Sequence, residues 1–363
     1  MTAIRAGVCR SFGKPVAVEG VELREPGPGE VAVRVAACAI CHTDLSLVEG
    51  VWGGALPAVY GHEVAGVVEE IGAGVVGIAP GGHAVVTLVR FCGSCALCLR
   101  GLPALCERKG DLPLSRSSPL RTSGGDPVDQ GLRTAGFAER VLVHHSQVVP
   151  IPADVPLGVA ALLGCGVVTG VGAVLRTAEV EPGSTVAVIG TGGVGLNAVQ
   201  GAALAGARLV VAVDLVPSKL DAARAFGATH VVDPSVDDLA GAVRELTDGR
   251  GLDYVVVTAG SAPAVEQALT LVADGAAVVL AGMPGGAKAA IDPEELAHRG
   301  VSILGSKVGS TRPQIDVPAL LALYRAGRLK LDELVSARFP LERIDDALAA
   351  ARRGDSLRVV LVP

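Results

Sequence analysis

The chain has 363 residues, half of them apolar, and a formal net charge of −6 at pH 7. This length is enough for two domains with substantial cores. The mild acidity and the scattered Lys and Arg residues argue against nucleic acid or an anionic membrane surface as the natural partner. With only one Trp, three Tyr and five Phe, the cores must be built mainly from Val, Ala and Leu.

Neither a secretion signal nor a membrane span is predicted. The first twenty residues lack an apolar segment of the signal-peptide type and read as a strand with a turn. The uncharged segment 155–175 has transmembrane length, but it contains five glycines and Pro156 and has no flanking cluster of positive charges. We therefore expect a cytoplasmic protein without a membrane partner.

Short strands dominate the first 150 residues. Val-rich runs separated by Gly and Pro predict strands over Val31–Ala37, Val64–Ile71, His83–Leu88 and Val141–Val149. The polar segment Asp111–Arg133, rich in Ser, Pro and Gly, is predicted to form a surface loop.

Four of the eight cysteines stand within fifteen residues, in the pattern Cys92-x2-Cys95-x2-Cys98-x7-Cys106. This spacing lets four thiolates converge on one tetrahedral ion, and a closed four-thiolate site is typical of structural zinc. An iron–sulfur cluster also uses four cysteines, but the Cys-Pro that usually ends such a run is absent. Four unrelated thiols, or a disulfide framework in a chain without a secretion signal, are weaker interpretations.

From about residue 185 strands and helices alternate. Helices are predicted over stretches such as Val194–Ala205 and Ser218–Phe226. Six apolar runs between such helices predict a doubly wound parallel sheet; the runs are Thr185–Ile189, Leu209–Val213, Thr229–Val232, Tyr254–Val257, Ala277–Leu280 and Val301–Leu304. The last sixty residues change character again, with a predicted helix over Val317–Ala326 and a closing strand over Arg358–Val362.

A G-x-G-x-x-G turn follows the first of these six runs and opens a helix, which is the context that dinucleotide binding requires. Its glycines allow a tight turn and a close approach of pyrophosphate to backbone N–H groups. An ordinary strand-to-helix turn is the alternative. The candidate cofactor-binding residues of the turn are Gly190, Gly192, Gly193, Val194 and Gly195.

Asp214 ends the next predicted strand and completes this candidate site. A carboxylate there can accept hydrogen bonds from both ribose hydroxyls and would repel a 2′-phosphate, so NAD is favoured over NADP. Lys219 could also reach the ribose, or it is simply a solvated helix lysine.

Three further metal-ligand candidates, Cys41, His62 and Cys165, are widely spaced. Two thiolates and one imidazole leave a fourth position open, as in catalytic zinc sites. Spacing alone does not show that they converge, and each residue taken separately is more often part of a packed core.

These motifs occur together in an order that resembles the zinc-dependent alcohol dehydrogenases of the medium-chain dehydrogenase/reductase superfamily. The resemblance covers nearly the whole chain and is strongest to the branch with class I/III, aryl-alcohol and thiol-dependent formaldehyde dehydrogenases. The motifs are Cys41-His-Thr-Asp44, Gly61-His62-Glu63, the four-cysteine run, Gly164-Cys165-Gly-Val-Val-Thr-Gly170 and the Gly190–Gly195 turn.

The resemblance implies an α/β plus β fold. A GroES-like catalytic domain would comprise residues 1–166, with a structural zinc lobe at 90–108, and residues 308–363. A Rossmann NAD-binding domain would occupy residues 167–307. The family further implies NAD and two Zn²⁺ per chain, a small-molecule alcohol or aldehyde as partner, and a homodimer, with a homotetramer as the alternative.

The resemblance also implies roles for individual residues. Cys41, His62 and Cys165 would hold the catalytic zinc. Thr43 would take up the alcohol proton, Asp44 would accept a hydrogen bond from His62, and Glu63 would assist ligand exchange from behind the metal. His42 and Arg358 match positions that reach the cofactor pyrophosphate; an exposed loop histidine is the weaker interpretation of His42.

Several positions depart from the family pattern. Ser46 stands where many relatives place a histidine that ends the proton relay, and a serine hydroxyl can pass a proton but does not hold one at neutral pH. Trp52 and Gly110 stand where glutathione-dependent relatives use Asp and Arg to grip the adduct. Trp52 would line the substrate mouth or anchor a surface loop. Leu88, at a position that is often aromatic, suggests a roomy apolar pocket.

The sequence therefore predicts an NAD-dependent oxidoreductase of primary, hydrophobic or aromatic, alcohols and aldehydes. One alternative is a formaldehyde dehydrogenase that acts on a thiol adduct. Another is a catalytically idle binding protein with the same fold, but an idle protein has no need for an open thiolate and imidazole zinc site.

Overall fold

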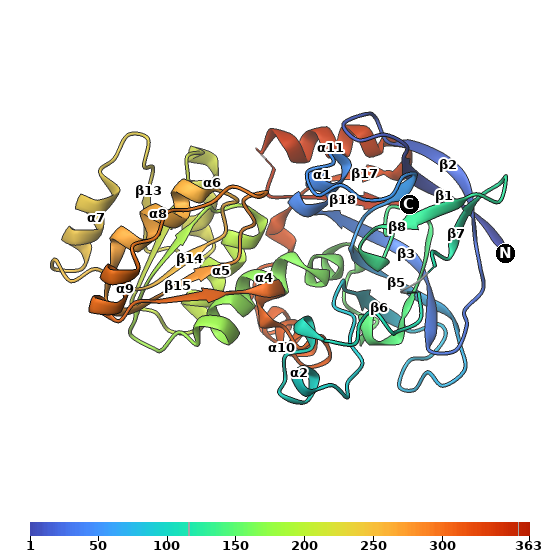
Figure 1. The fold of residues 1–363 in the computed structure, drawn as a ribbon, viewed down its shortest axis with the longest axis horizontal. Coiled ribbons are helices and arrows are strands. Elements are labelled where there is room, and N and C mark those ends of the chain that lie inside the picture. The colour runs from blue at the N-terminus through green and yellow to red at the C-terminus, as the bar shows by residue number, and fades with distance from the viewer. Residues whose placement is uncertain (115–116, 355) are drawn as a thin grey trace. The chain divides into compact units, whose positions relative to one another are not determined.

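The structure is a computed structural model that describes residues 1–114, 117–354 and 356–363. It divides the chain into two units, which are coloured by residue number in Figure 1. The first unit comprises residues 1–165, 312–324 and 331–363, and the second comprises residues 166–311 and 325–330. The boundaries predicted at 166/167 and 307/308 lie close to these divisions. The short segment 325–330 was not predicted to belong with the second unit.

The first unit contains two β-sheets. A closed barrel is formed by β1 (Thr2–Cys9), β2 (Ala17–Leu23), β7 (Leu120–Thr122), β8 (Pro127–Gln130) and β4 (Ala58–Val59). A seven-stranded sheet has the order β10 (Val148–Ile151), β6 (His83–Val86), β5 (Glu63–Ile71), β3 (Glu30–Ile40), β18 (Arg358–Val362) and β17 (Val335–Pro340), with β9 (Arg140–His144) also paired to β3. Val is frequent in these strands because its branched side chain packs well on a pleated surface.

Short helices complete the first unit. They are α1 (His42–Val48), α2 (Ala96–Leu99), η1 (Pro103–Leu105), η2 (Gly131–Arg133), η3 (His145–Gln147), α3 (Leu157–Ala160), η4 (Ala161–Gly164), α10 (Pro313–Arg325), η7 (Asp332–Leu334), η8 (Leu341–Arg343) and α11 (Ile344–Arg353). The amphipathic helix α11 buries Ile344, Ala347, Leu348 and Ala350 in the core of this unit.

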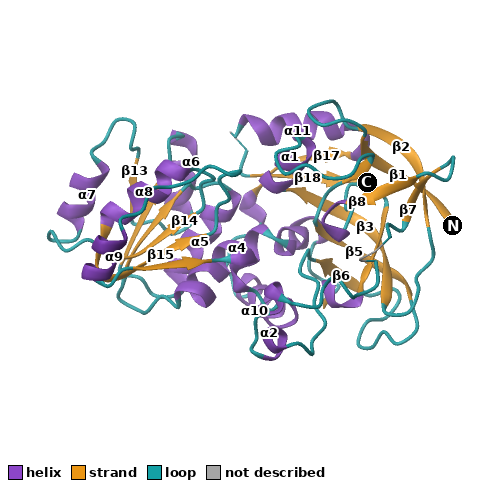
Figure 2. Cartoon of the chain, viewed as in Figure 1, coloured by secondary structure: helices purple, strands orange, loops and turns teal. Residues whose placement is uncertain are grey.

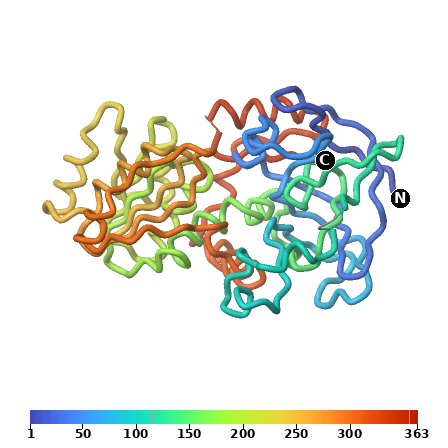
Figure 3. Tube along the Cα trace, in the orientation of Figure 1, coloured from blue at the N-terminus to red at the C-terminus, as the bar shows by residue number. Residues whose placement is uncertain are grey.

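The two ends of the chain meet inside the first unit. Strand β18 runs antiparallel to β3, with Val359 opposite Ile40 and Leu361 opposite Cys38. Figure 3 shows the C-terminal trace in red beside the N-terminal trace in blue. This pairing brings Arg358, at the start of β18, to the end of β3, where Cys41 follows.

The second unit is built on one parallel sheet of six strands. Its order is β13 (His230–Val232), β12 (Leu209–Val213), β11 (Thr185–Ile189), β14 (Leu252–Val257), β15 (Val272–Leu280) and β16 (Ser302–Gly305). Numbered along the chain this order is 3-2-1-4-5-6, which is the doubly wound dinucleotide-binding arrangement. The predicted α/β plus β fold is therefore confirmed.

Helices connect the strands of this sheet (Figure 2). They are α5 (Gly193–Leu204), α6 (Pro217–Ala225), α7 (Leu239–Leu246), α8 (Ala262–Leu271) and α9 (Pro293–Arg299). The unit begins with α4 (Gly166–Gly172) and the π-helical η5 (Ala173–Ala178), and η6 (Lys307–Ser310) follows β16. Strands β11 and β12 are buried along their whole length, as expected for a sheet with helices on both faces.

Three local predictions were wrong. The single strand predicted over 141–149 is divided into β9 and β10 by η3, because the His144 ring accepts a hydrogen bond from the Ser146 N–H and closes a turn. The segment 111–133 is more than a surface loop, since β7 and β8 of the barrel lie in it; Ser115 and Arg116 lie outside the described residues. The helix predicted from Val317 begins at Pro313, where proline is tolerated in a first turn.

Within the described residues, no single helix is long and apolar enough to cross a membrane. The bent helical pair Leu157–Gly164 and Gly166–Ala178 has the required length and composition. Its residues from 159 to 174 are all buried within the protein.

Candidate zinc centres and dinucleotide turn

The four cysteines predicted to hold a structural zinc converge. Their sulfur atoms lie within 4.8 Å of one another. The Sγ atoms of Cys92 and Cys98 are 4.0 Å apart, and those of Cys95 and Cys106 are 3.9 Å apart. Four ligands about 2.3 Å from a tetrahedral zinc would be separated by about 3.8 Å. These distances are far too long for disulfide bonds, and none of the eight cysteines, all of which lie in the described part of the chain, forms one.

Backbone amides surround the sulfur of Cys92. The N–H groups of Ser94 and Cys95 point to it at 3.4 and 3.3 Å. Hydrogen bonds from Ser94 lower the pKa of Cys92 to about 6. Burial and the neighbouring Cys95, by contrast, raise the pKa of Cys98 to about 12. A dication between the four sulfur atoms would compensate the charge of bound thiolates.

The second group of predicted ligands also converges, and it is fully buried. The ligand atoms of Cys41, His62, Glu63 and Cys165 lie within 4.8 Å of one another. Cys41 caps the N-terminus of α1, His62 lies directly before β5, Glu63 is the first residue of β5, and Cys165 separates η4 from α4. Gly164 permits this approach, because a Cβ atom there would lie 2.8 Å from the Cα atom of Glu63.

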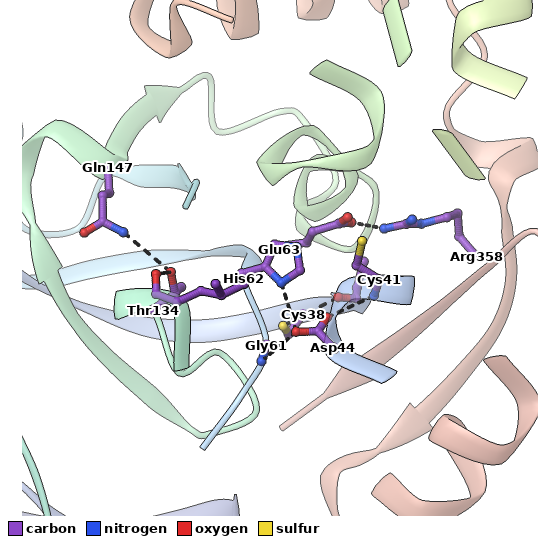
Figure 4. A network of polar contacts seen from close by, with 11 residues as sticks. Cys38, Cys41, Asp44, Gly61, His62, Glu63, Thr134, Gln147 and Arg358 are labelled. Carbon is purple, nitrogen blue, oxygen red and sulfur yellow. Dashed lines mark hydrogen bonds and ion pairs between the residues drawn. The ribbon is translucent and has the colours of Figure 1, made fainter. Parts of the chain in front are cut away.

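Asp44 fixes the ring of His62. Its buried carboxylate accepts hydrogen bonds from the backbone N–H groups of Cys41 and Gly61, at 3.0 and 3.1 Å, and contacts His62 Nδ1 at 2.9 Å. Figure 4 shows these three contacts converging on Asp44. With Nδ1 engaged, Nε2 is left to face the cluster, as in carboxylate–histidine–metal arrangements.

Arg358 lies behind the cluster and pairs with Glu63. Both side chains are buried, and the guanidinium donates to the Glu63 carboxylate (Figure 4). Burial raises the pKa of Glu63 to about 7, although the charge of Arg358 opposes this. Burial by itself would lower the pKa of Arg358, but the charges of Glu63 and Cys41 raise it above its usual value. One permanent positive charge is therefore held beside two acidic ligand candidates.

The residues of the buried cluster fit a zinc ion. Among the described residues, His62 Nε2 is buried without a hydrogen-bond partner. Burial opposes protonation of His62, but Asp44 and Cys41 raise its pKa well above the usual value, so a cation is favoured at this nitrogen. A hydrogen bond with Cys165 holds the pKa of Cys41 well below its usual value. A thiolate, an imidazole nitrogen and a second sulfur are the donor set that zinc prefers.

The remaining predicted residues of the first unit lie on or near α1 and β6. His42 is exposed at the first position of α1, and Thr43 and Ser46 are partly exposed on the same helix. Trp52 lies in the turn after α1 with 40% of its surface exposed. Leu88 follows β6 and is half-buried. The positions of these five residues do not test their predicted roles, which therefore stay predictions.

The glycine turn of the second unit has the geometry that its motif predicts. Gly190 has a φ of +90°, and a Cβ atom there would lie 2.8 Å from the backbone nitrogen of Ala259. A Cβ atom at Gly195 would lie 1.8 Å from the carbonyl oxygen of Gly190. Gly192 caps α5, and Gly193 and Val194 form its first turn. Helix α5 therefore starts close against β11, with its N-terminal amides available to an anion.

Asp214 is tied to this turn. Its Oδ2 accepts hydrogen bonds from the N–H and the hydroxyl of Thr191, at 2.7 and 3.1 Å, and its Oδ1 accepts from the N–H of Val216 at 3.0 Å. Asp214 therefore lies beside the glycine turn, as a ribose ligand must. Lys219 is half-buried on α6.

Two family models match the chain over most of its length. The alcohol dehydrogenase GroES-like domain matches residues 27–153, and the zinc-binding dehydrogenase domain matches residues 193–326. The chain belongs to the zinc-dependent alcohol dehydrogenase family. Because this family consists of dehydrogenases, the chain is an enzyme.

Full-length relatives support this assignment. The NDMA-dependent alcohol dehydrogenase of Amycolatopsis methanolica is 38% identical over 375 residues, covering 99% of this chain and 98% of that protein. The class-3 alcohol dehydrogenase of Myxine glutinosa is 36% identical over 368 residues, covering 98% of this chain and 97% of that protein.

Solved structures resemble the alcohol dehydrogenase along its whole length. A zinc-binding domain protein from Burkholderia ambifaria has a TM-score of 0.95 at 36% identity, and benzyl alcohol dehydrogenase from Acinetobacter calcoaceticus has 0.92 at 32%; each match covers 100% of this chain and 99% of the other. A zinc-binding dehydrogenase from Sinorhizobium meliloti, bound to NADP, has 0.84 at 31%, with both chains fully covered.

Sequence reasoning missed three features of these sites. It did not pair Arg358 with Glu63, because 295 residues separate them. It did not single out Thr191, whose N–H and hydroxyl donate hydrogen bonds to Asp214. A small residue is common in a glycine turn, so its presence at position 191 did not indicate this contact. Cys38 was also not singled out. It is buried beside the cluster, and burial raises the pKa of its thiol well above the usual value. The four residues whose ligand atoms converge do not include it.

Proposed function

We propose that the enzyme transfers a hydride between NAD and primary hydrophobic or aromatic alcohols, at a zinc held by Cys41, His62 and Cys165. The observation that carries this proposal is the buried ligand set in which His62 Nε2 has no hydrogen-bond partner among the described residues. Three protein ligands that leave a position for substrate are typical of catalytic zinc.

The bound zinc would supply a Lewis acid at the alcohol oxygen, and NAD would accept the hydride. The protein's own contribution is to fix and balance the ligands. Asp44 holds the His62 ring so that Nε2 faces the two sulfur atoms. Arg358 places a positive charge beside Glu63 and Cys41, so the cluster is less anionic than its ligands alone would make it. Glu63 is then positioned to assist exchange of the open ligand.

Helix α1 supplies a path for the alcohol proton. Thr43 and Ser46 are three residues apart on this helix and therefore lie on the same face. Thr43 would accept the proton of the alcohol hydroxyl and pass on its own hydroxyl proton, while the hydrogen on the alcohol carbon leaves as a hydride to NAD. Ser46 would pass the proton to solvent, because a serine hydroxyl does not retain it. A water molecule would then carry the proton from Ser46 into the solvent.

The second unit supports NAD as the cofactor. The amides of the turn from Gly190 to Gly195 would bind the pyrophosphate. Asp214, fixed by Thr191, would accept hydrogen bonds from the ribose and repel a 2′-phosphate. We assign His42 and Arg358 to the pyrophosphate and Lys219 to the ribose on the family resemblance. The resemblance also supports two zinc ions per chain and a cytoplasmic homodimer, with a homotetramer as the alternative that light scattering distinguishes.

The proposed substrates are free alcohols. Trp52 and Leu88 would offer apolar surface, and the similar Acinetobacter enzyme is named for benzyl alcohol. Positions 52 and 110 hold Trp and Gly, which cannot grip the charged ends of a glutathione adduct.

A panel of alcohols and aldehydes, followed through NADH absorbance with and without glutathione, tests the proposal. We expect thiol-independent oxidation of benzylic and medium-chain alcohols, with affinity rising as buried CH₂ groups each contribute about 0.8 kcal/mol. Metal analysis should find two zinc ions per chain. Strong formaldehyde oxidation that requires a thiol, with feeble activity on free alcohols, would instead indicate a thiol-adduct dehydrogenase.

A further inference from the structure

The segment that carries His62 is hydrogen-bonded to a loop, residues 131–137, that contains strained backbone conformations. The backbone carbonyls of Tyr60 and Gly61 accept hydrogen bonds from the N–H groups of Phe137 and Gly136, at 2.9 and 2.7 Å. Just before this contact, three residues that are not glycine have left-handed backbone conformations. They are Leu132, Arg133 and Ala135, with φ values of 50°, 57° and 58°.

Such conformations persist only where the surroundings hold them, and they concentrate at functional sites. Two buried glutamines hold this loop. Gln130 Nε2 donates to the carbonyl of Leu142 at 2.7 Å and of Thr134 at 3.4 Å. Gln147 Nε2 donates to the carbonyl of Arg133 at 3.2 Å and lies 3.5 Å from the Thr134 hydroxyl (Figure 4).

Gln147 makes a second set of contacts that Gln130 lacks. Its backbone carbonyl accepts from the N–H of Thr87 at 2.9 Å, and its Nε2 donates to the carbonyl of Thr87 at 3.0 Å. Both backbone groups of Thr87 are therefore held by one residue. Backbone carbonyls can only accept hydrogen bonds, so the NH₂ group of Gln147, and not its amide oxygen, must point toward Thr87 and Arg133.

Thr87 lies at the edge of the zinc cluster. Strands β5 and β6 are antiparallel, with Val64 opposite Val86. Continuing this register past the end of the ladder places Thr87 beside Glu63 and Leu88 beside His62. In addition, a Cβ atom on Gly164, the neighbour of Cys165, would lie 2.9 Å from the carbonyl oxygen of Val86. The end of β6 therefore passes along the ligands.

We propose that Gln147 is a positioning residue that sets the width of the alcohol pocket. It fastens the end of β6, which leads into Leu88, to the strained loop that backs His62, and so fixes both flanks of the ligand segment 62–63. The amide oxygens of both glutamines are buried without a hydrogen-bond partner among the described residues. An unpaired buried acceptor lowers stability. We therefore infer that glutamine is present at both positions for the hydrogen bonds that its NH₂ group donates.

Gln130 provides a matched control for the test. We compare Gln147→Met with Gln130→Met, because both remove a buried amide of the same size that hydrogen-bonds to the same loop. Melting temperatures should fall by similar amounts. The KM for benzyl alcohol should rise about tenfold in Gln147→Met, the equivalent of one to two net hydrogen bonds, and stay within about twofold in Gln130→Met. The KM for NAD and the zinc content should be unchanged in both variants.

Hydrogen exchange gives a second readout that needs no turnover. Amides of residues 83–90 should exchange faster in Gln147→Met than in Gln130→Met, while those of residues 131–137 should be affected in both. Equal changes of alcohol KM and of exchange at 83–90 in the two variants would overturn the proposal. If Gln147→Met does not fold, Gln147→Asn and Gln130→Asn are compared by the same measurements.

The inference rests on the proposed function, but the two can fail separately. If the wild-type enzyme oxidises no alcohol, the proposed function fails, and exchange at residues 83–90 still decides whether Gln147 holds this segment. If the wild-type enzyme is active and the two variants have the same alcohol KM, Gln147 does not set the pocket.

Discussion

The two cysteine clusters of the first unit bring ligands together in different ways. The four-cysteine lobe draws its ligands from fifteen consecutive residues, and Cys92 and Cys98 are partly exposed. The second cluster draws Cys41, His62 and Cys165 from three separate segments, and all three residues are buried. A closed site can therefore fold as a local loop around its metal, whereas an open site has to be built by the core of the domain.

The groups that hydrogen-bond to the ligands of the two clusters also differ, being local in one cluster and distant in sequence in the other. Backbone N–H groups of the lobe itself point at the sulfur of Cys92. The buried cluster instead depends on side chains from elsewhere in the fold, with Asp44 behind His62 and Arg358 behind Glu63. We expect damage to the lobe to be structural and local, and damage to the buried cluster to affect catalysis.

Replacement of Cys165 by Ala should have the largest effect. The buried cluster would lose one of its three ligands, and a catalytic zinc contributes several kcal/mol to transition-state stabilisation. Activity on benzyl alcohol should fall on the order of 10³-fold or more, and one zinc per chain should be lost while the lobe keeps its own. Cys9→Ala, at another buried cysteine, is the control. Full zinc content together with normal activity in Cys165→Ala would disprove the ligand assignment.

Replacement of Arg358 by Gln should have the next largest effect, seen as a loss of stability. It leaves the Glu63 carboxylate buried without its cation, and breaking a buried pair in this way typically costs about 3–5 kcal/mol. Chemical denaturation of the holoenzyme measures the change. The double variant Arg358→Gln/Glu63→Gln should recover part of the loss.

The exposed pair of Arg10 and Glu19 gives the control for this measurement. Arg10→Gln should lower stability far less than Arg358→Gln, because exposed ion pairs contribute little. An equally small change in Arg358→Gln would show that the buried charge is balanced by another group.

Asp44→Asn should have an intermediate effect on the buried cluster and none on the lobe. The carboxylate accepts three hydrogen bonds, and an amide at this position would lose part of that capacity and release the ring of His62. Loss of such a hydrogen-bonding partner typically costs about 10–100-fold in metal affinity or activity. Chelator competition and kcat/KM are the measurements. If the lobe zinc were weakened as much as the catalytic zinc, the separation of the two sites would be wrong.

The contrast between the clusters also explains how far the sequence could be interpreted. The lobe was predictable because its spacing is local, and the glycine turn because strand, turn and helix are adjacent in the chain. The six strands of the second unit were recognisable as apolar runs. The convergence of Cys41, His62 and Cys165 required the family resemblance, because the spacing of these three residues does not show whether the segments that carry them meet.

Other features depended on tertiary contacts that leave no local pattern. The Arg358–Glu63 pair exists because β18 joins β3. Strands β7 and β8 are short and polar, and they are stabilised by closing the barrel, so their segment looked like a loop. The break after His144 depends on one side-chain hydrogen bond to the Ser146 N–H, which a Val-rich strand pattern conceals.

Replacement of Cys95 by Ser should change activity least. It tests the four-cysteine lobe in the way that Cys165→Ala tests the buried cluster. The proposed zinc of the lobe would occupy a closed site, so it would contribute folding free energy and take no part in the reaction. We expect the loss of one zinc per chain and activity within about twofold of wild type. The melting temperature should fall by roughly 5 °C, as expected when ~2 kcal/mol is lost from a unit of this size. Cys41→Ser, at the buried cluster, provides the matched opposite: activity should collapse while the lobe zinc is retained. If Cys95→Ser abolished activity with its catalytic zinc still bound, the lobe would have to act on the reaction site, and the division between a folding metal and a reacting metal would not hold.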